Sequence, residues 1–152
     1  MFALMVLALV AFMQMVIREN TDTRNLTCLA LNVYFEARGE PRAGQRAVAE
    51  VTLNRVASRH YPDTICEVVY QENWDYKRRR NVSAFSWTEL NKIPGLKGKT
   101  WQAAWEAAEA VYFHRFPPLL DGALFYHARR IRPAWAKEKR VVARIGRHIF
   151  YQ

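Results

Sequence analysis

Acidic side chains and cysteines are scarce in this sequence, and each shortage excludes something. The chain has 14 Asp and Glu against 23 Lys and Arg, and the net charge of +9 indicates a polyanionic partner. Such a partner is nucleic acid, a membrane surface or an anionic cell-wall polymer. Neither Cys28 nor Cys66 belongs to a CxxC pair, and an HExxH motif is missing, so we expect no metal and no cofactor.

Internal repeats and low-complexity tracts are also lacking. With 152 residues, 51% of them hydrophobic, the chain is predicted to form one domain with a substantial core. In an exported chain Cys28 and Cys66 could form a disulfide, which would stabilise the fold by about 4 kcal/mol on the chain-entropy estimate. Two buried free thiols are the alternative.

The first segment lacks two marks of a cleaved signal peptide, a basic start and a small-x-small cleavage site. Residues 2–17 are apolar except for Gln14, slightly short of the roughly 17 to 25 residues of a spanning helix. A buried N-terminal helix is the alternative, but this run has no polar face. We predict a signal anchor at 1–17, a polar linker at 18–25 and the main domain at 26–152.

The rest of the chain has helices first and short β-prone runs later. Helical spacing and the stop at Gly39-Glu40-Pro41 predict helices at 26–38, 43–58 and 101–113, and β-prone runs lie at 122–128 and 140–152. Residues 72–98 are polar and irregular, as in a binding loop or disorder, although their aromatic residues favour an ordered surface. The fold class is therefore α+β, with a small antiparallel sheet.

Two carboxylates at the first helix break are candidates for chemistry. Glu36 lies in an apolar stretch, where desolvation would raise its pKa and let it donate a proton, as glycoside cleavage requires. A surface ion pair with Arg38 or Arg42 is an equal alternative from the residues alone. Glu40, between Gly39 and Pro41, is predicted to cap the second helix.

Five segments, in order, carry a resemblance to a known family. Residues 28–56, CLALNVYFEARGEPRAGQRAVAEVTLNRV, resemble the signature of the cell wall hydrolase family typified by the spore cortex-lytic enzyme SleB. The resemblance continues in YPDTICEVVYQ, FSWT, GALFYHA and IGRHIFY, up to residue 151. It implies a lysozyme-like, mainly helical α+β domain that cleaves peptidoglycan between N-acetylmuramic acid and N-acetylglucosamine. By this resemblance the first glutamate of the EARGE motif, Glu36, is the catalytic acid and base of a lytic transglycosylase.

The same resemblance marks supporting residues. Ser86, Trp87, Tyr126 and His127 lie in the matching segments and are expected, with Glu40, to bind substrate or support the site; ordinary core is the alternative for Trp87 and Tyr126. One carboxylate is sufficient for a transglycosylase, because the muramic O6 hydroxyl attacks within the same molecule.

Three alternatives remain at this point: a muramidase that uses water, a non-catalytic wall- or nucleic-acid-binding module that uses the basic cluster Lys77–Arg80, and a zinc amidase or peptidase. The expected partners are peptidoglycan strands and, through residues 2–17, a membrane, with no nucleic acid; the chain is expected to be a monomer. We expect it to be exported and either tethered to the inner membrane facing the periplasm or released there. A phage endolysin or a Gram-negative periplasmic hydrolase would suit these features.

Overall fold

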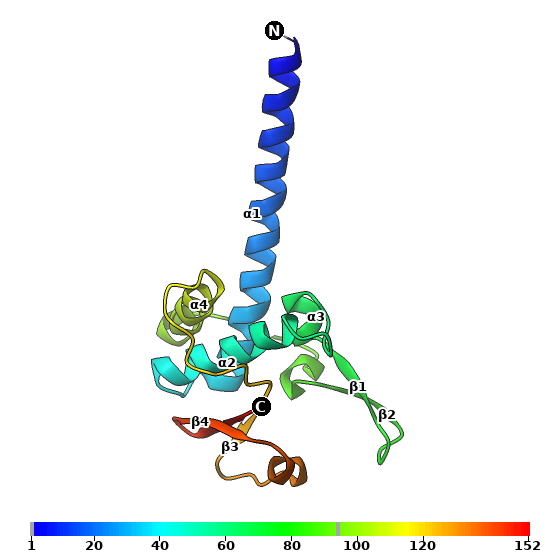
Figure 1. Cartoon of the computed structure of the whole chain (residues 1–152), viewed down its shortest axis with the longest axis vertical. Coiled ribbons are helices and arrows are strands. Elements are labelled where there is room, and N and C mark those ends of the chain that lie inside the picture. The colour runs from blue at the N-terminus through cyan, green and yellow to red at the C-terminus, as the bar shows by residue number, and fades with distance from the viewer. Residues whose placement is uncertain (1, 94) are drawn as a thin grey trace.

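A long N-terminal helix projects like a stalk from a small head domain in the computed structural model, which describes residues 2–93 and 95–152 (Figure 1). This helix, α1 (Phe2–Ala37), has 36 residues. It contains neither glycine nor proline, so nothing in its backbone chemistry interrupts it before Gly39. Residues 18–25, predicted to form a linker, are helical instead. The hydroxyls of Thr21 and Thr23 in that segment bond to backbone carbonyls four residues back.

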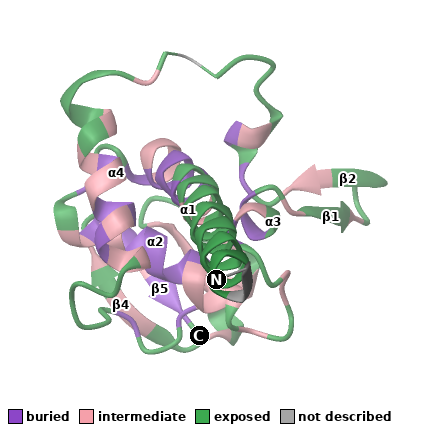
Figure 2. Ribbon diagram, turned by 90° about the horizontal axis from the view of Figure 1, so that it is seen from above, coloured by how far each residue is buried: buried purple, intermediate pink, exposed green. Residues whose placement is uncertain are grey.

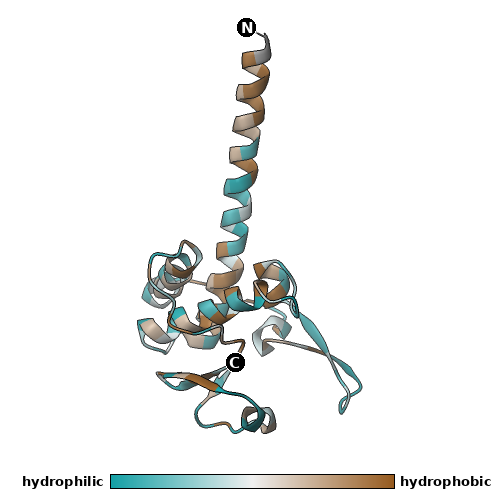
Figure 3. Ribbon diagram, viewed as in Figure 1, coloured by the Kyte–Doolittle hydropathy of each residue, from teal (hydrophilic) through white to brown (hydrophobic). Residues whose placement is uncertain are grey.

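The N-terminal half of α1, up to Ile17, is apolar except for Gln14. Residues 4–17 are exposed, and Figure 3 shows the hydrophobic residues gathered at this end of the helix. By length and composition α1 is a candidate membrane span, and none of its qualifying window is buried in the protein.

The C-terminal third of α1 is the central helix of the head. It packs against α2 (Arg42–Val56), α3 (Ile65–Val69) and α4 (Gly98–Tyr112), so the predicted helices are confirmed and residues 65–69 add one more. Side chains of these helices form a core whose fully buried members include Leu29, Val33, Ala104 and Ala108. A disulfide between Cys28 and Cys66 joins α1 to α3, which confirms the predicted pairing.

The predicted small sheet closes the other side of the head. Strands β3 (Phe125–Ala128), β4 (Val141–Ile145) and β5 (His148–Tyr151) form an antiparallel sheet in the order β3-β5-β4. Its central residue, Phe150, is fully buried in a second core with residues of α2 such as Val48 and Val51. A short 3-10 helix, η2 (Ala134–Glu138), lies between β3 and β4. The α+β class, mainly helical with a small antiparallel sheet, is confirmed.

Residues 72–98 are more regular than predicted. They contain an antiparallel hairpin of β1 (Glu72–Asp75) and β2 (Arg80–Ser83), followed by the 3-10 helix η1 (Ser86–Glu89). The hairpin projects from the head and is mostly exposed (Figure 2), so it has no buried face to impose a hydrophobic alternation on its sequence. Its turn is held by Asp75, whose Oδ1 accepts the backbone N–H groups of Lys77 and Arg78.

Candidate active site

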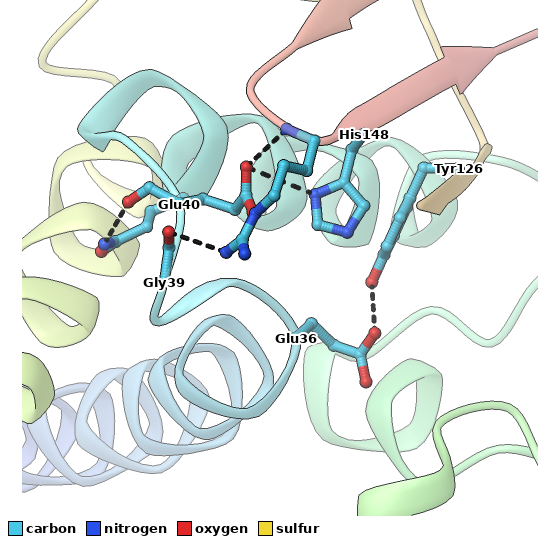
Figure 4. A network of polar contacts seen from close by, with 7 residues as sticks. Glu36, Gly39, Glu40, Tyr126 and His148 are labelled. Carbon is cyan, nitrogen blue, oxygen red and sulfur yellow. Dashed lines mark hydrogen bonds and ion pairs between the residues drawn. The ribbon is translucent and has the colours of Figure 1, made fainter. Parts of the chain in front are cut away.

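Glu36 lies in the last turn of α1, where the helix reaches the sheet. Its Oε2 accepts a hydrogen bond of 3.3 Å from the hydroxyl of Tyr126, which β3 supplies from 90 residues away (Figure 4). The fold therefore brings together two of the residues singled out in the sequence. Glu36 makes no ion pair with Arg38 or Arg42 in the described chain, and Arg42 instead pairs with Glu106 at 2.6 Å.

An aromatic stack borders Glu36 along α1. The ring of Phe35 stacks on Trp87 with centroids 4.7 Å apart, and Nε1 of Trp87 donates to the Asn32 side chain at 3.2 Å. Trp87 is only 6% exposed. It therefore belongs to the core, which was the alternative for this residue, and offers no open surface for sugar stacking. A supporting role at the site stays a prediction.

The pKa of the Glu36 carboxyl is raised. Burial is the largest cause, and the hydrogen bond from Tyr126 and the charge of Arg55 oppose it. A carboxyl in this setting holds its proton closer to neutral pH than a solvated one does, which is the property that a general acid needs.

Arg55, which the sequence did not single out, fixes the strand that carries Tyr126. Its Nε donates to the Leu124 carbonyl at 2.9 Å, and its guanidinium lies against the rings of Tyr61 and Phe85. The cation thus faces Glu36 from α2 while holding the chain just before β3. No local signal marks it among the 23 basic residues, because its partner lies 69 residues away.

Tyr126 is a durable hydrogen-bond donor. Burial, followed by the nearby charge of Glu36, raises its pKa well above the ordinary value. The hydroxyl therefore keeps its proton over the whole physiological range and orients the Glu36 carboxylate from one side.

Glu40 forms an ion pair with Arg147. Its carboxylate accepts two hydrogen bonds of 2.7 Å from Arg147, one from the backbone N–H and one from Nε. No side-chain hydrogen bond caps the start of α2 at Pro41, and the predicted stabilisation of this helix start by the charge of Glu40 stays a prediction. Burial opposes ionisation of Glu40, but the bonds from Arg147 and the proximity of His148 outweigh it and lower the pKa.

Gly146 makes room for this contact. It has φ +56°, a conformation that favours glycine, and a Cβ at this position would collide with the Glu40 carboxylate. The EARGE and IGRH segments, which the sequence showed only as separate matches, thus meet at Glu40 and Arg147.

His148 stands between Glu40 and the Glu36–Tyr126 pair (Figure 4). Its ring meets Tyr126 edge-on with centroids 5.4 Å apart, and its Nδ1 lies 4.0 Å from Glu40 Oε2. The residue is 8% exposed, and burial lowers its pKa. Sequence reasoning assigns His148 no role in the site.

The remaining candidates, His127 and Ser86, have no hydrogen bond to Glu36 within the described residues. His127 follows Tyr126 in β3, where successive side chains point to opposite faces. Its Nδ1 donates to the Ala128 carbonyl, and its Nε2 accepts from the Tyr151 hydroxyl at 2.7 Å. Ser86 is exposed at the start of η1. Within the described residues no group of three His, Cys, Asp or Glu side chains could hold a metal ion.

Comparison with known proteins gives one consistent result. Residues 39–151 match the sequence profile of a family described as cell wall hydrolase. The spore cortex-lytic enzyme of Bacillus subtilis is 30% identical over 134 residues, which cover 87% of this chain and 38% of that protein. Its counterpart in Bacillus cereus is 28% identical over 126 residues, 83% of this chain and 43% of that protein.

Two solved structures share the fold. The catalytic domain of the germination-specific lytic transglycosylase SleB from Bacillus anthracis superimposes with a TM-score of 0.67 at 29% identity, covering 84% of this chain and 93% of that one. The catalytic domain of Bacillus cereus SleB gives 0.64 at 27% identity, covering 86% and 91%. The chain spans about two fifths of the length of the curated relatives that it matches. The family match begins at residue 39, so Glu40 lies inside it and Glu36 just before it.

Proposed function

Because this chain belongs to the cell wall hydrolase family, we propose that it cleaves the peptidoglycan strand between N-acetylmuramic acid and N-acetylglucosamine, with Glu36 as the general acid and base. The observation that carries the proposal is the Glu36 carboxyl itself. It is partly buried beside an aromatic stack, has a raised pKa and accepts a hydrogen bond from Tyr126. This is the setting of a carboxyl that can protonate a glycosidic oxygen.

The chemistry needs two proton transfers by one carboxyl. Protonated Glu36 gives its proton to the glycosidic oxygen as the bond to the anomeric carbon breaks. The resulting carboxylate then takes the proton of the muramic O6 hydroxyl, whose oxygen bonds to the anomeric carbon and closes a 1,6-anhydro ring. Tyr126 keeps its own proton, so it can donate a hydrogen bond to the Glu36 carboxyl both when Glu36 is protonated and when it is ionised.

The state of Glu40 favours this route over one with two carboxylates. Arg147 engages both of its oxygens, and its lowered pKa keeps it ionised at neutral pH. Glu40 therefore cannot serve as a second proton donor, and its hydrogen bonds to Arg147 hold its carboxylate toward the turn between β4 and β5. Attack by the substrate's own O6 hydroxyl needs no second carboxylate, whereas most glycoside hydrolases use a pair.

A product analysis tests the proposal. Purified protein is incubated with sacculi, and the released fragments are analysed by mass spectrometry. A lytic transglycosylase gives 1,6-anhydromuramic ends, whereas a muramidase gives reducing ends that are heavier by one water. Glu36→Gln should lower the rate by about a hundredfold or more, the usual range for loss of a proton-transfer group.

Two controls accompany this experiment. Glu106→Gln changes an exposed carboxylate of the Arg42 pair and should leave the rate unchanged. Glu36→Gln should unfold no more easily than the wild type at neutral pH, because a carboxyl whose pKa is raised on folding opposes folding once ionised. Full activity in Glu36→Gln would contradict the assignment, and reducing ends alone would replace the transglycosylase by a muramidase.

For the location of the protein we propose export with residues 2–17 as a membrane anchor. Residues 4–17 are exposed and helical, and they are apolar except for Gln14 up to Arg18, an arrangement that lipid would stabilise and water would not. The head is then a monomeric domain on the periplasmic side of the inner membrane, or one released from it.

A further inference from the structure

Positive charge is concentrated around the small sheet. Residues 129–147 contain six arginines, two lysines and one glutamate, a net charge of +7 out of +9 for the whole chain. Figure 1 shows that this region lies at the end of the molecule opposite the start of α1. If α1 enters a membrane, this charge faces away from it, so lipid head groups are not the ligand that its position fits.

Part of this charge lines a cavity on the Glu40 side of the site. The cavity measures about 410 Å³ and is lined by Glu40, Ala128, Arg129, Arg130, Arg147 and His148. That volume falls within the usual range for sites that hold small ligands or parts of larger ones.

The cavity is lined by more cationic than anionic side chains. Its one carboxylate, Glu40, is already engaged by Arg147. Arg129 and Arg130 are exposed, and among the ion pairs of residues 2–93 and 95–152 neither guanidinium takes part. The backbone N–H of Arg129 donates to the Arg147 carbonyl at 2.7 Å, which fixes this edge of the cavity against the β4–β5 turn. Guanidinium groups in this situation favour carboxylates, which they bind in a bidentate manner.

One buried side chain connects this cavity to Glu36. His148 lines the cavity and contacts Tyr126, whose hydroxyl bonds to Glu36. Its buried Nδ1 has no hydrogen-bond partner in the part of the chain that the structure describes. The side chains of Tyr126 and His148 thus lie between the Glu36 carboxyl and the cavity.

We propose that this cavity is a subsite for the carboxylate groups of the peptide stem that muramic acid carries. The inference rests on the proposed function, since the muramic acid must lie at Glu36 for its stem to reach Arg129 and Arg130. The basic tip of the hairpin, Lys77–Arg80, is a poorer candidate because it projects from the head away from the sheet (Figure 1).

A binding experiment in the inactive background tests the subsite without depending on catalysis. Glu36→Gln protein is sedimented with intact sacculi and with sacculi whose carboxylates are converted to neutral amides by carbodiimide and methylamine. Amidation should weaken binding about tenfold, which corresponds to about 1.4 kcal/mol. Two exposed guanidinium–carboxylate contacts account for a loss of this size. Adding Arg129→Gln and Arg130→Gln should weaken binding to native sacculi to a similar extent and remove the sensitivity to amidation.

A matched control separates the subsite from general attraction. Lys77→Gln with Arg80→Gln removes the same charge from the hairpin and should keep the sensitivity to amidation. An equal loss in this control, or a preference for native sacculi that persists without Arg129 and Arg130, would overturn the proposal.

The same sacculi with active protein distinguish the two proposals. Binding that depends on Arg129, Arg130 and substrate carboxylates, without any glycan products from the wild type, would refute the proposed function and keep the subsite. If the wild type releases normal glycan products and amidation changes neither its binding nor its rate, the subsite is refuted and the proposed function is kept.

Discussion

Arg147 binds the carboxylate of Glu40 through both its backbone N–H and its Nε, each at 2.7 Å, across 107 residues of sequence. The contact joins the turn after α1 to the turn between β4 and β5. It thereby fixes the sheet that carries Tyr126 relative to the helix that carries Glu36. The site geometry depends on this contact, although neither residue touches the Glu36 carboxyl.

Replacing Glu40 should therefore destabilise the fold. Glu40→Gln leaves one oxygen for the backbone N–H of Arg147 but removes the charge, and we expect a loss of about 1–2 kcal/mol in the free energy of unfolding. Urea unfolding followed by circular dichroism measures it. Glu106→Gln, in an exposed pair, is the control and should unfold almost as the wild type does.

The stability difference between wild type and Glu40→Gln should depend on pH. Because folding lowers the pKa of Glu40, its contribution is fully present above the ordinary value of 4.5 and is lost as the pH falls through the lower folded-state pKa. The unfolding curves of the wild type and of Glu40→Gln should differ at pH 7 and converge at several pH values below 4.5. A constant difference would show that Glu40 contributes by packing and not by its charge.

Tyr126→Phe should change the pH dependence of activity. The tyrosine hydrogen bond lowers the pKa of Glu36, so its removal should raise that pKa further. Activity that requires protonated Glu36 falls as the pH rises through this pKa, and the alkaline limb should move to higher pH in the variant. Initial rates on sacculi between about pH 4 and 9, a range that begins near the ordinary carboxyl pKa and extends above it, measure the shift. A limb that stays in place would mean that another group controls activity.

Reduction of the disulfide should loosen the contact between α1 and α3. Cys28 and Cys66 are separated by 38 residues, and the chain-entropy estimate for such a loop is about 4 kcal/mol. Urea unfolding with and without reductant should show a large fall in the midpoint. The double variant Cys28→Ser, Cys66→Ser should unfold at the reduced midpoint in both buffers.

Deleting residues 2–17 should release the protein from membranes without loss of activity on sacculi. The side chains of residues 4–17 are exposed, so the deletion removes no core contact that the structure describes. Fractionation of expressing cells measures the release. Replacing the same residues with leucines should restore membrane attachment, and continued sedimentation of the deletion variant with membranes would argue against the anchor.

The helices and the small sheet could be predicted because their signals are local. Gly39 and Pro41 mark the break between α1 and α2, and the strands after residue 121 are dense in β-branched and aromatic residues. The polar hairpin could not be predicted in this way, since both its faces are largely exposed. Residues 18–25 were assigned as a linker from polarity alone, yet they contain nothing that ends a helix.

The site was predictable only in part. Glu36 could be singled out from its apolar neighbours, and Tyr126 from a segment that resembles a family. The roles of Arg55 and Arg147 depend on contacts between segments 69 and 107 residues apart, and His148 lies close to Glu40, 108 residues before it in the sequence. Spacing along the chain gives no information on such contacts. The sequence also cannot show that the carboxylate of Glu40 binds Arg147, which lies in the last turn of the chain.

Because α1 is one unbroken helix, the proposed enzyme would hold its active site at a fixed distance from the membrane. Ile17, the last apolar residue of the free segment, and Glu36 lie on one rod without a hinge, 19 residues apart or about 28 Å at the usual helical rise. If residues 2–17 lie in a membrane, the number of helical residues between Ile17 and Glu36 determines the distance from the bilayer to the bond that is cleaved. The enzyme would then cleave glycan strands at that distance from the bilayer. One added helical turn would increase the distance by about 5 Å.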